Sequence, residues 1–207
     1  MSDNHDHPHH PEHHLPSTYH EKLTAAVLEL LADKKILSQA QITESIDIMD
    51  ARGPHLGAKV VARAWTDPAF KQRLLADGSA ACSELGIDVG TLKLVVVENT
   101  EKVHNVIVCT LCSCYPKMLL GIPPAWYKSK AYRSRAAREP RKVLAEFGLT
   151  VPSDVTVRVH DSTADMRYLV LPMRPRGTES WSEERLTELV TRDAMIGVAR
   201  AKEPVAV

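Results

Sequence analysis

The chain has 207 residues and 44% of them are hydrophobic, so it can bury the core of one medium domain with an appendage, or of two small domains. Lysine and arginine total 26, as do aspartate and glutamate, which argues against nucleic acid or an anionic membrane as a partner. No apolar run is long enough to cross a membrane, and the polar, histidine-rich start is unlike a secretory signal.

Residues 1–18 are predicted to be a disordered tail. The start of this segment holds six histidines with prolines and acidic residues and almost nothing apolar, so ordering it would bury too little surface to offset the lost entropy. Such a tail is either a plain solvated segment or a weak scavenger of metal ions.

Residues 19–84 are predicted to form a helical arm. Apolar residues at helical spacing indicate a first helix, and Ser38 can cap a second helix that carries Ile42, Ile46 and Met49. Further helices are expected at 57–65 and at 68–78, the latter with Asp67 as its cap. The apolar stripes of the first two helices are narrow and lack a surface to cover them, which favours contact with a partner.

Residues 85–207 are predicted to form an α/β domain. Runs rich in β-branched residues predict strands at 92–98, 105–108, 155–159 and 166–171, with Asp161 and Ser162 as a turn between the last two. Helices are expected at 129–147, interrupted at Pro140, and at 182–193, capped by Ser182. The segment after the second strand is expected to be irregular because of Pro116, Gly121, Pro123 and Pro124. The predicted fold is α+β, with the helical arm followed by a layered α/β domain.

Three of the four cysteines, Cys109, Cys112 and Cys114, lie within six residues, directly after the second predicted strand. A tight loop with this spacing places three sulfurs on one side of a single point and brings the intervening backbone to the same point. If the amides of Ser113 and Cys114 lose their protons, the loop offers two nitrogens and three sulfurs to one ion. Five donors leave one position of an octahedral ion open for chemistry, and such strong donors suit a trivalent metal.

Other kinds of site could also use these cysteines, and each would need different residues around them. Structural zinc would need a fourth ligand, which His104 or Cys82 could supply, although neither gives the paired spacing typical of zinc sites. A redox pair at Cys109 and Cys112 would normally open a helix, which the following prolines disfavour. Cys82 lies in a helical stretch and is expected in the core. Clustered thiols outside a disulfide framework fit a cytoplasmic protein.

At this loop the sequence resembles the nitrile hydratase α subunit, whose metal-binding motif matches V-C-T-L-C-S-C at 108–114. The resemblance covers nearly the whole chain except the histidine-rich head and the extreme tail, and its motif is specific, with the metal-bearing subunit of thiocyanate hydrolase as a close relative. Upstream it includes G-P-H-L-G-A-K-V-V at 53–61, A-W-T-D-P at 64–68, L-L-A-D-G at 74–78 and V-V-V-E-N-T at 95–100. Downstream it includes P-P-A-W-Y-K at 123–128, Y-R-S-R at 132–135, R-E-P-R-K-V-L at 138–144, R-Y-L-V-L-P at 167–172 and L-V-T-R-D-A-M-I-G-V at 189–198.

The resemblance implies the nitrile hydratase α-subunit fold and the hydration of a nitrile to an amide by a Lewis-acidic metal. It implies one ion per chain, Co(III) or alternatively Fe(III), held by the sulfurs of Cys109, Cys112 and Cys114 and the amides of Ser113 and Cys114. Cys112 would be oxidised to a sulfinic acid and Cys114 to a sulfenic acid. Cys114 and Ser113 are then the candidate catalytic residues: Cys114 attacks the nitrile or activates water, and Ser113 relays protons or is simply small enough for the turn.

The resemblance also implies partners. Family members pair with a β subunit, which supplies arginines to the oxidised cysteines and part of the substrate pocket, and a metallochaperone or activator is a further expected partner. The helical arm would pack on this β-type subunit. The basic cluster is interpreted as intersubunit salt bridging or a solvated helix face, and it comprises Arg133, Arg135, Arg138, Arg141 and Lys142. A thiocyanate hydrolase-type subunit and a non-catalytic metal-binding module are the competing predictions.

Details of the sequence refine the resemblance. Thr110 and Tyr115 match the cobalt-type pattern. Lys117 and Met118 stand where the family usually continues with Trp-Pro, so a flat wall of the substrate pocket is replaced by a flexible cation. His160 stands where many members have Trp, and residues 87–93 lack the usual Gln-Gly-Glu stretch. We therefore expect a larger or more polar nitrile than a simple aliphatic one, such as the nucleoside nitrile toyocamycin, unless Lys117 merely points to solvent.

Overall fold

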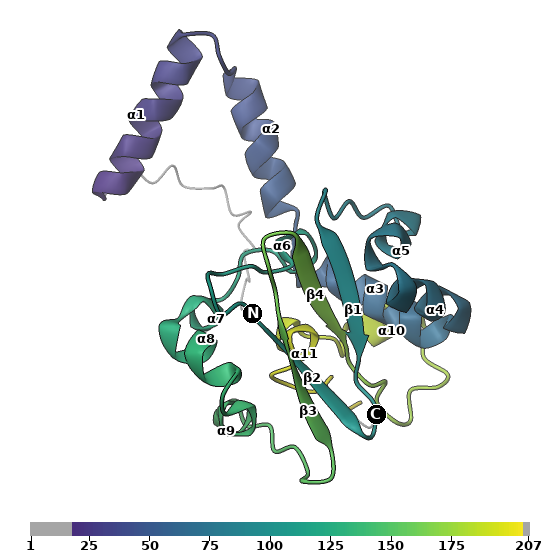
Figure 1. The fold of residues 1–207 in the computed structure, drawn as a ribbon. Coiled ribbons are helices and arrows are strands. Elements are labelled where there is room, and N and C mark those ends of the chain that lie inside the picture. The colour runs from purple at the N-terminus through teal and green to yellow at the C-terminus, as the bar shows by residue number, and fades with distance from the viewer. Residues whose placement is uncertain (1–17, 205–207) are drawn as a thin grey trace, which may run out of the picture. The chain divides into compact units, whose positions relative to one another are not determined.

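The computed structural model describes residues 18–204 and confirms the α+β fold class (Figure 1). The chain divides into two compact units, Met1–Ile48 and Met49–Val207. The predicted disordered tail lies outside the described residues, apart from Thr18. Among the described residues, no helix combines the length and the apolar character that a membrane span requires.

The first unit is built around two amphipathic helices, α1 (Tyr19–Asp33) and α2 (Gln39–Asp50). Helix α1 begins one residue after Thr18, whose hydroxyl accepts from the Glu21 amide in a capping box. Ser38 caps α2 in the same way, since its hydroxyl accepts from the Gln41 amide at 3.2 Å. Neither helix has a buried residue, so the predicted apolar stripes are exposed.

The second unit opens with three helices, α3 (Pro54–Thr66), α4 (Pro68–Ala76) and α5 (Gly78–Glu84). Asp67 and Asp77 cap the latter two through their carboxylates. Helix α4 corresponds to the helix predicted at 68–78 and ends at Ala76, because Asp77 caps the helix that follows. Helices α4 and α5 pack on the first strand. The predicted boundary between arm and domain at residue 85 therefore does not coincide with the boundary between the compact units.

Four short strands form two parallel pairs. Strand β1 (Lys93–Glu98) pairs with β4 (Met166–Leu171), and β2 (Val103–Val108) pairs with β3 (Thr156–Asp161). Within the second unit, α3, α4, α5 and α10 lie on the side of β1, and α7 to α9 lie on the side of β3 (Figure 1). The core between these layers buries the ends of β2 and β4, namely Val106, Ile107, Val108, Leu169, Val170 and Leu171.

Two predicted segments are wrong in detail. The segment after the cysteines contains two single-turn helices, α6 (Lys117–Leu120) and α7 (Ala125–Lys128), because Pro116 and Pro124 immediately precede them, where a missing amide proton costs nothing. The helix predicted at 182–193 is split into α10 (Glu183–Thr187) and α11 (Arg192–Ile196), since Thr191 caps a new helix. The break at Pro140 is present between α8 (Lys130–Ala136) and α9 (Pro140–Glu146).

A buried polar network joins the strands to the end of α11. The Asn105 amide group donates to the Glu98 carbonyl and to Asn99 Oδ1, and Asn105 Oδ1 accepts from His160 Nε2 at 2.8 Å. His104 Nε2 lies 2.7 Å from the Gly197 carbonyl, which can only accept, so this nitrogen carries a proton. His104 Nδ1 lies 3.4 Å from Asn99 Nδ2, which can only donate, so Nδ1 is the acceptor and the ring is neutral. Each polar group is thus paired, which is the condition for stable burial.

Gly197 ends α11 at a close approach to β2. Its φ is +91°, and a methyl group there would overlap the Asn105 carbonyl, whereas Gly177 has a similar φ of +76° and open space around it. We expect Gly197→Ala to destabilise the fold by about 3 kcal/mol or more, and Gly177→Ala by about 1 kcal/mol, because only the first adds a steric clash to the backbone strain. Urea unfolding of both variants measures the difference, and equal losses would contradict the close approach.

Burial lowers the pKa of both His104 and His160 below the ordinary value of about 6.5. The unfolded chain therefore binds protons that the fold excludes, so stability is complete above about pH 6.5 and falls as the pH drops below it, by up to about 1.4 kcal/mol per pH unit for each ring. Urea midpoints between about pH 5.5 and 7.5 test this expectation. The variant His104→Gln is expected to be less stable at pH 7.5 and to show a flatter pH profile; an unchanged profile would refute the role of His104.

Candidate metal centre

The three clustered cysteines lie on a loop, residues 109–114, that leaves the buried end of β2; we call it the claw loop. Val108 and Cys109 are almost completely buried, and the chain then runs outward so that Cys114 is half-buried and Cys112 is exposed. The β-branched run of β2 requires a buried strand, and the polar and small residues that follow it cannot continue that burial. The loop therefore stands where the core meets the surface.

The sulfur atoms of the claw loop converge. Cys112 Sγ lies 3.3 Å from Cys109 Sγ and 3.2 Å from Cys114 Sγ, and all three sulfurs lie within 4.8 Å of one another. Sulfurs bound to one ion at about 2.3 Å are separated by distances of this order. The donor set that was predicted from the spacing is thus brought together by the fold.

Hydrogen bonds inside the claw loop make its thiols unequal. The pKa of Cys112 is lowered to about 7 by hydrogen bonds from the Cys114 and Cys109 side chains and from the Cys114 and Ser113 backbone. Burial raises the pKa of Cys114 to about 12. Hydrogen bonding thus favours a thiolate at Cys112, whereas burial disfavours one at Cys114. The backbone groups that lower the pKa of Cys112 belong to Ser113 and Cys114, whose amides the sequence predicts as donors to a metal.

Asp161 holds the start of the claw loop from the neighbouring strand. It pairs with Val108 in the parallel register, and its carboxylate accepts from Thr110 N at 2.9 Å and from Thr110 Oγ1 at 2.6 Å. The Ser162 amide also donates to the Val108 carbonyl at 2.7 Å. Asp161 was predicted only as a turn residue, and its place at the carboxyl end of a strand is the signal that could have indicated this role.

Two tyrosines from the helices that follow the claw loop form hydrogen bonds with its backbone and with the strand before it. Tyr127, from α7, is completely buried and donates its hydroxyl to the Cys114 carbonyl at 2.9 Å. Tyr132, from α8, donates to the Ile107 carbonyl at 2.7 Å, just before the claw loop. Both ends of the loop are therefore fixed by groups that lie far along the chain. No spacing pattern in the sequence indicates these contacts.

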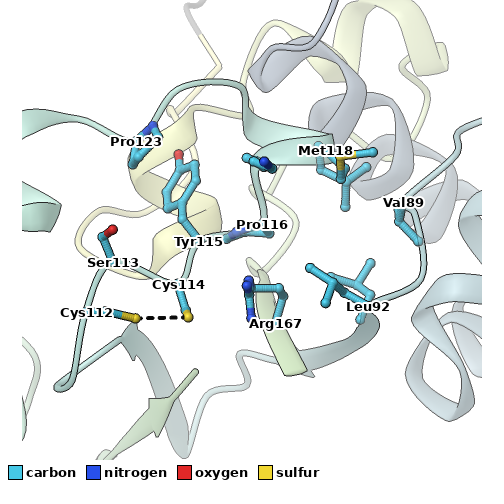
Figure 2. Close-up of a pocket in the computed structure, with 13 residues that line it drawn as sticks. Val89, Leu92, Cys112, Ser113, Cys114, Tyr115, Pro116, Met118, Pro123 and Arg167 are labelled. Atoms are coloured by element: carbon cyan, nitrogen blue, oxygen red, sulfur yellow. Dashed lines mark hydrogen bonds between the residues drawn. The ribbon is translucent and has the colours of Figure 1, made fainter. Parts of the chain in front are cut away.

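An apolar cavity of about 340 Å³ opens beside the sulfurs (Figure 2). Figure 2 shows Cys112, Ser113 and Cys114 on one side and Val89 and Leu92 on the other, with Arg167 between them. The remaining wall comes from the segment after the claw loop, including both predicted pocket residues, Lys117 and Met118. The cavity thus gives a small apolar molecule access to the open side of the claw loop.

The structure separates the claw loop from the ligands that a zinc site would need. Among the described residues, the potential metal-binding group at this place contains only the three clustered cysteines. Cys82 is completely buried elsewhere, as predicted, and His104 is held by Asn99 and Gly197. His160 also lies away from the cavity lining, against Tyr168. Neither Cys82 nor His104 completes a four-ligand zinc site.

Comparison with known proteins assigns the family. The model of the family described as "Nitrile hydratase, alpha chain" matches residues 18–199. The chain is 54% identical over 185 residues to the α subunit of a low-molecular-weight cobalt-containing nitrile hydratase from Rhodococcus rhodochrous, covering 86% of this chain and 87% of that one. The chain belongs to the nitrile hydratase α-chain family. The predicted resemblance is confirmed over nearly the whole described sequence.

Two further relatives show how widely this α-chain fold is used. A subunit of thiocyanate hydrolase from Thiobacillus thioparus, named gamma, is 43% identical over 199 residues, which is 90% of this chain and 82% of that one. A double mutant of an Fe-type nitrile hydratase from Comamonas testosteroni Ni1 superposes with a TM-score of 0.84 at 42% identity, covering 91% of this chain and 94% of that chain. The α-chain fold therefore accompanies more than one metal and more than one named activity.

The contact between Asp161 and Thr110 predicts that metal retention depends on β3. Asp161→Ala removes both acceptors, and hydrogen bonds to a charged group contribute about 1.5–3 kcal/mol each, so we expect metal per chain to fall several-fold. Elemental analysis of the purified α chain measures this. Asp154→Ala is the matched control, since it removes an exposed carboxylate paired with Lys102 and should leave the metal content unchanged. Full metal content in the Asp161→Ala protein would contradict the role of Asp161.

Proposed function

We propose that this α chain hydrates nitriles to amides at one cobalt ion. The main supporting observation is the convergence of three sulfurs beside an apolar cavity, in a chain 54% identical to an α subunit named as cobalt-containing. The proposed ligands are the sulfurs of Cys109, Cys112 and Cys114 with the amides of Ser113 and Cys114. Fe(III) is the alternative ion, because a relative of Fe type shares the fold.

The residues present fit such an ion. The three thiols already lie within the reach of one metal, and the backbone of Ser113 and Cys114 lies close enough to the Cys112 sulfur to lower its pKa. Soft sulfur donors with deprotonated amides suit a trivalent transition metal better than zinc. When bound, the metal supplies Lewis acidity that polarises the nitrile or activates water. Cys112 and Cys114 are proposed to be oxidised to sulfinic and sulfenic acids, which adds oxygen acceptors beside the cavity.

The residues around the claw loop define the proposed reaction geometry. Ser113 and Cys114 line the cavity, so their side chains lie next to a molecule that enters it. An oxygen on Cys114 would either attack the nitrile carbon or take a proton from water, while the Ser113 hydroxyl passes protons or keeps the turn compact. Tyr127 fixes the Cys114 carbonyl, which limits movement of the reacting sulfur. The apolar wall excludes bulk water from the same space.

A β-type subunit is the proposed partner, with a metallochaperone or activator during metal loading. The α-chain assignment itself implies a second kind of chain. The first unit supports this, since its two helices expose large apolar side chains, among them Leu23, Leu30, Ile46 and Met49. In the predicted basic cluster, Arg135 and Lys142 pair with acidic residues of this same chain, so these two are less available for intersubunit salt bridges. A cytoplasmic location agrees with four cysteines that form no disulfide.

A thiocyanate hydrolase-type activity is the second candidate. It is favoured by the 43% identity to the thiocyanate hydrolase subunit over most of both chains. Thiocyanate is a small anion without an apolar body, whereas the cavity beside the claw loop has room for a larger molecule with an apolar body. The cavity therefore supports the predicted larger or more polar nitrile, although no feature of the described residues is specific to toyocamycin.

Metal analysis and intact mass of the α chain, matured with its β-type partner and cobalt, test the proposal. We expect one cobalt per α chain and a mass gain of three oxygen atoms on the claw loop. The Cys112→Ala protein should lose the cobalt and the added oxygen. The Cys82→Ala protein, which lacks a buried thiol elsewhere, should retain the cobalt and the added oxygen. Zinc with no added oxygen in the native protein would overturn the catalytic proposal in favour of a non-catalytic metal-binding module.

The same preparation identifies the substrate class. Amide formation from benzonitrile at least as efficient as from acrylonitrile is expected, because the lost Trp wall leaves room and the remaining wall is apolar. A preference for acrylonitrile would contradict the larger substrate, and turnover of thiocyanate without nitriles would favour the second candidate.

A further inference from the structure

The cavity beside the claw loop has an unusual charge distribution. Its far wall is apolar, with Val89, Leu92 and Leu94 from the segment before β1 and from its start. Two cations, Lys117 and Arg167, also line it, and within the described part of the chain no carboxylate does. A ligand with a negative group would meet two cations and no carboxylate among the described lining residues, on the side away from the thiolates of the claw loop.

Arg167 faces inward, toward the claw loop. It stands in β4, and its guanidinium donates to the backbone carbonyls of Thr163 and Ala164, which hold it in place. Figure 2 shows it between Cys114 and Leu92. Arg167 therefore lies between the claw loop and the apolar wall of the cavity.

Lys117 is the second cation that lines the cavity. It is exposed at the first position of α6, and among the described residues it forms no ion pair. Some lysines of the same unit do have acidic partners, such as Lys71 with Glu98 and Lys102 with Asp154, but Lys117 is the lysine without one that lines the cavity in the described part of the chain. An ammonium group on a flexible stem can follow a ligand group across the mouth of the cavity.

Building on the proposed nitrile hydration, we propose that the cavity selects nitriles that carry a carboxylate or a similar anionic group, which Lys117 binds. The apolar body of such a nitrile lies against the wall formed by Val89 and Leu92. The thiolates of the claw loop repel the anionic end, so the nitrile end is directed to the sulfurs and the anion to Lys117. Lys117 is thereby a specificity-determining residue, and it takes no part in the chemical step.

Matched substrates test this with the cobalt-loaded α chain and its β-type partner. We compare kcat/KM for 4-cyanobenzoate, neutral 4-tolunitrile and cationic 4-(aminomethyl)benzonitrile, which share one ring and one nitrile. The native enzyme is expected to prefer the anion to the neutral compound about five-fold or more at low salt, through KM, and the preference should shrink as salt screens the exposed pair. The cation should be the poorest substrate.

Variants at Lys117 test whether this residue causes the preference for the anionic nitrile. Lys117→Met should abolish the preference for 4-cyanobenzoate, Lys117→Arg should keep it, and Lys117→Glu should reverse it in favour of the cationic nitrile. Lys128→Met is the matched control, because Lys128 is exposed on the neighbouring α7 but does not line the cavity, and it should keep the native ratio. Hydration of 4-tolunitrile without any preference for the anion would overturn this inference alone. Failure to hydrate any of the three nitriles would overturn the proposed function.

Discussion

The parallel pairing of β2 with β3 is the constraint on which the metal centre depends. The carboxyl ends of parallel strands reach the same edge of a sheet, so Asp161 lies opposite Val108. Its carboxylate accepts hydrogen bonds from Thr110, two residues after Val108. Because Cys109 is still anchored in the core, the claw loop has a fixed start and a fixed direction. The sulfurs therefore converge by backbone geometry, and the chain needs no disulfide or preformed helix to gather them.

The other end of the loop is fixed by aromatic packing. Tyr127 and Tyr132 lie in contact with each other and with Trp126, and each buries a hydroxyl whose partner is a main-chain carbonyl near the claw loop. Burying a ring gains apolar contact, while the paired hydroxyl avoids an unsatisfied polar group. The network of Asn105, His104 and His160 acts similarly within the strands. These two hydroxyls and this network are hydrogen-bonded, whereas the buried hydroxyl of Tyr115, which packs on Tyr127, has no hydrogen-bond partner among the described residues.

The sequence predicts the local parts of this arrangement well and the long-range parts poorly. The cysteine spacing predicts the donor cluster, the β-branched runs predict the four strands, and Asp67, Ser38 and Ser182 are the predicted caps. The roles of Asp161 and Tyr127 arise from contacts between segments that are distant in the chain, which no periodicity records. The short helices α6 and α7 were missed because Pro116 and Pro124 were interpreted as breakers, whereas proline is also favourable just where a helix begins.

The proposed metal donors form one side of the cavity, whereas its other walls come from different segments of the chain, so those walls can change while the claw loop stays the same. All proposed donors lie within the claw loop, while the walls come from residues before β1, from the segment around α6 and from β4. Met118 is held from outside the claw loop, by Arg52, which donates to its sulfur at 2.7 Å. A substitution at Lys117 therefore alters the charge at the cavity mouth while Asp161 and Tyr127 still position the sulfurs. Replacement of the usual Trp by Lys is consequently a change that this fold can accept at little cost to the metal centre, and its proposed effect is on which nitriles enter.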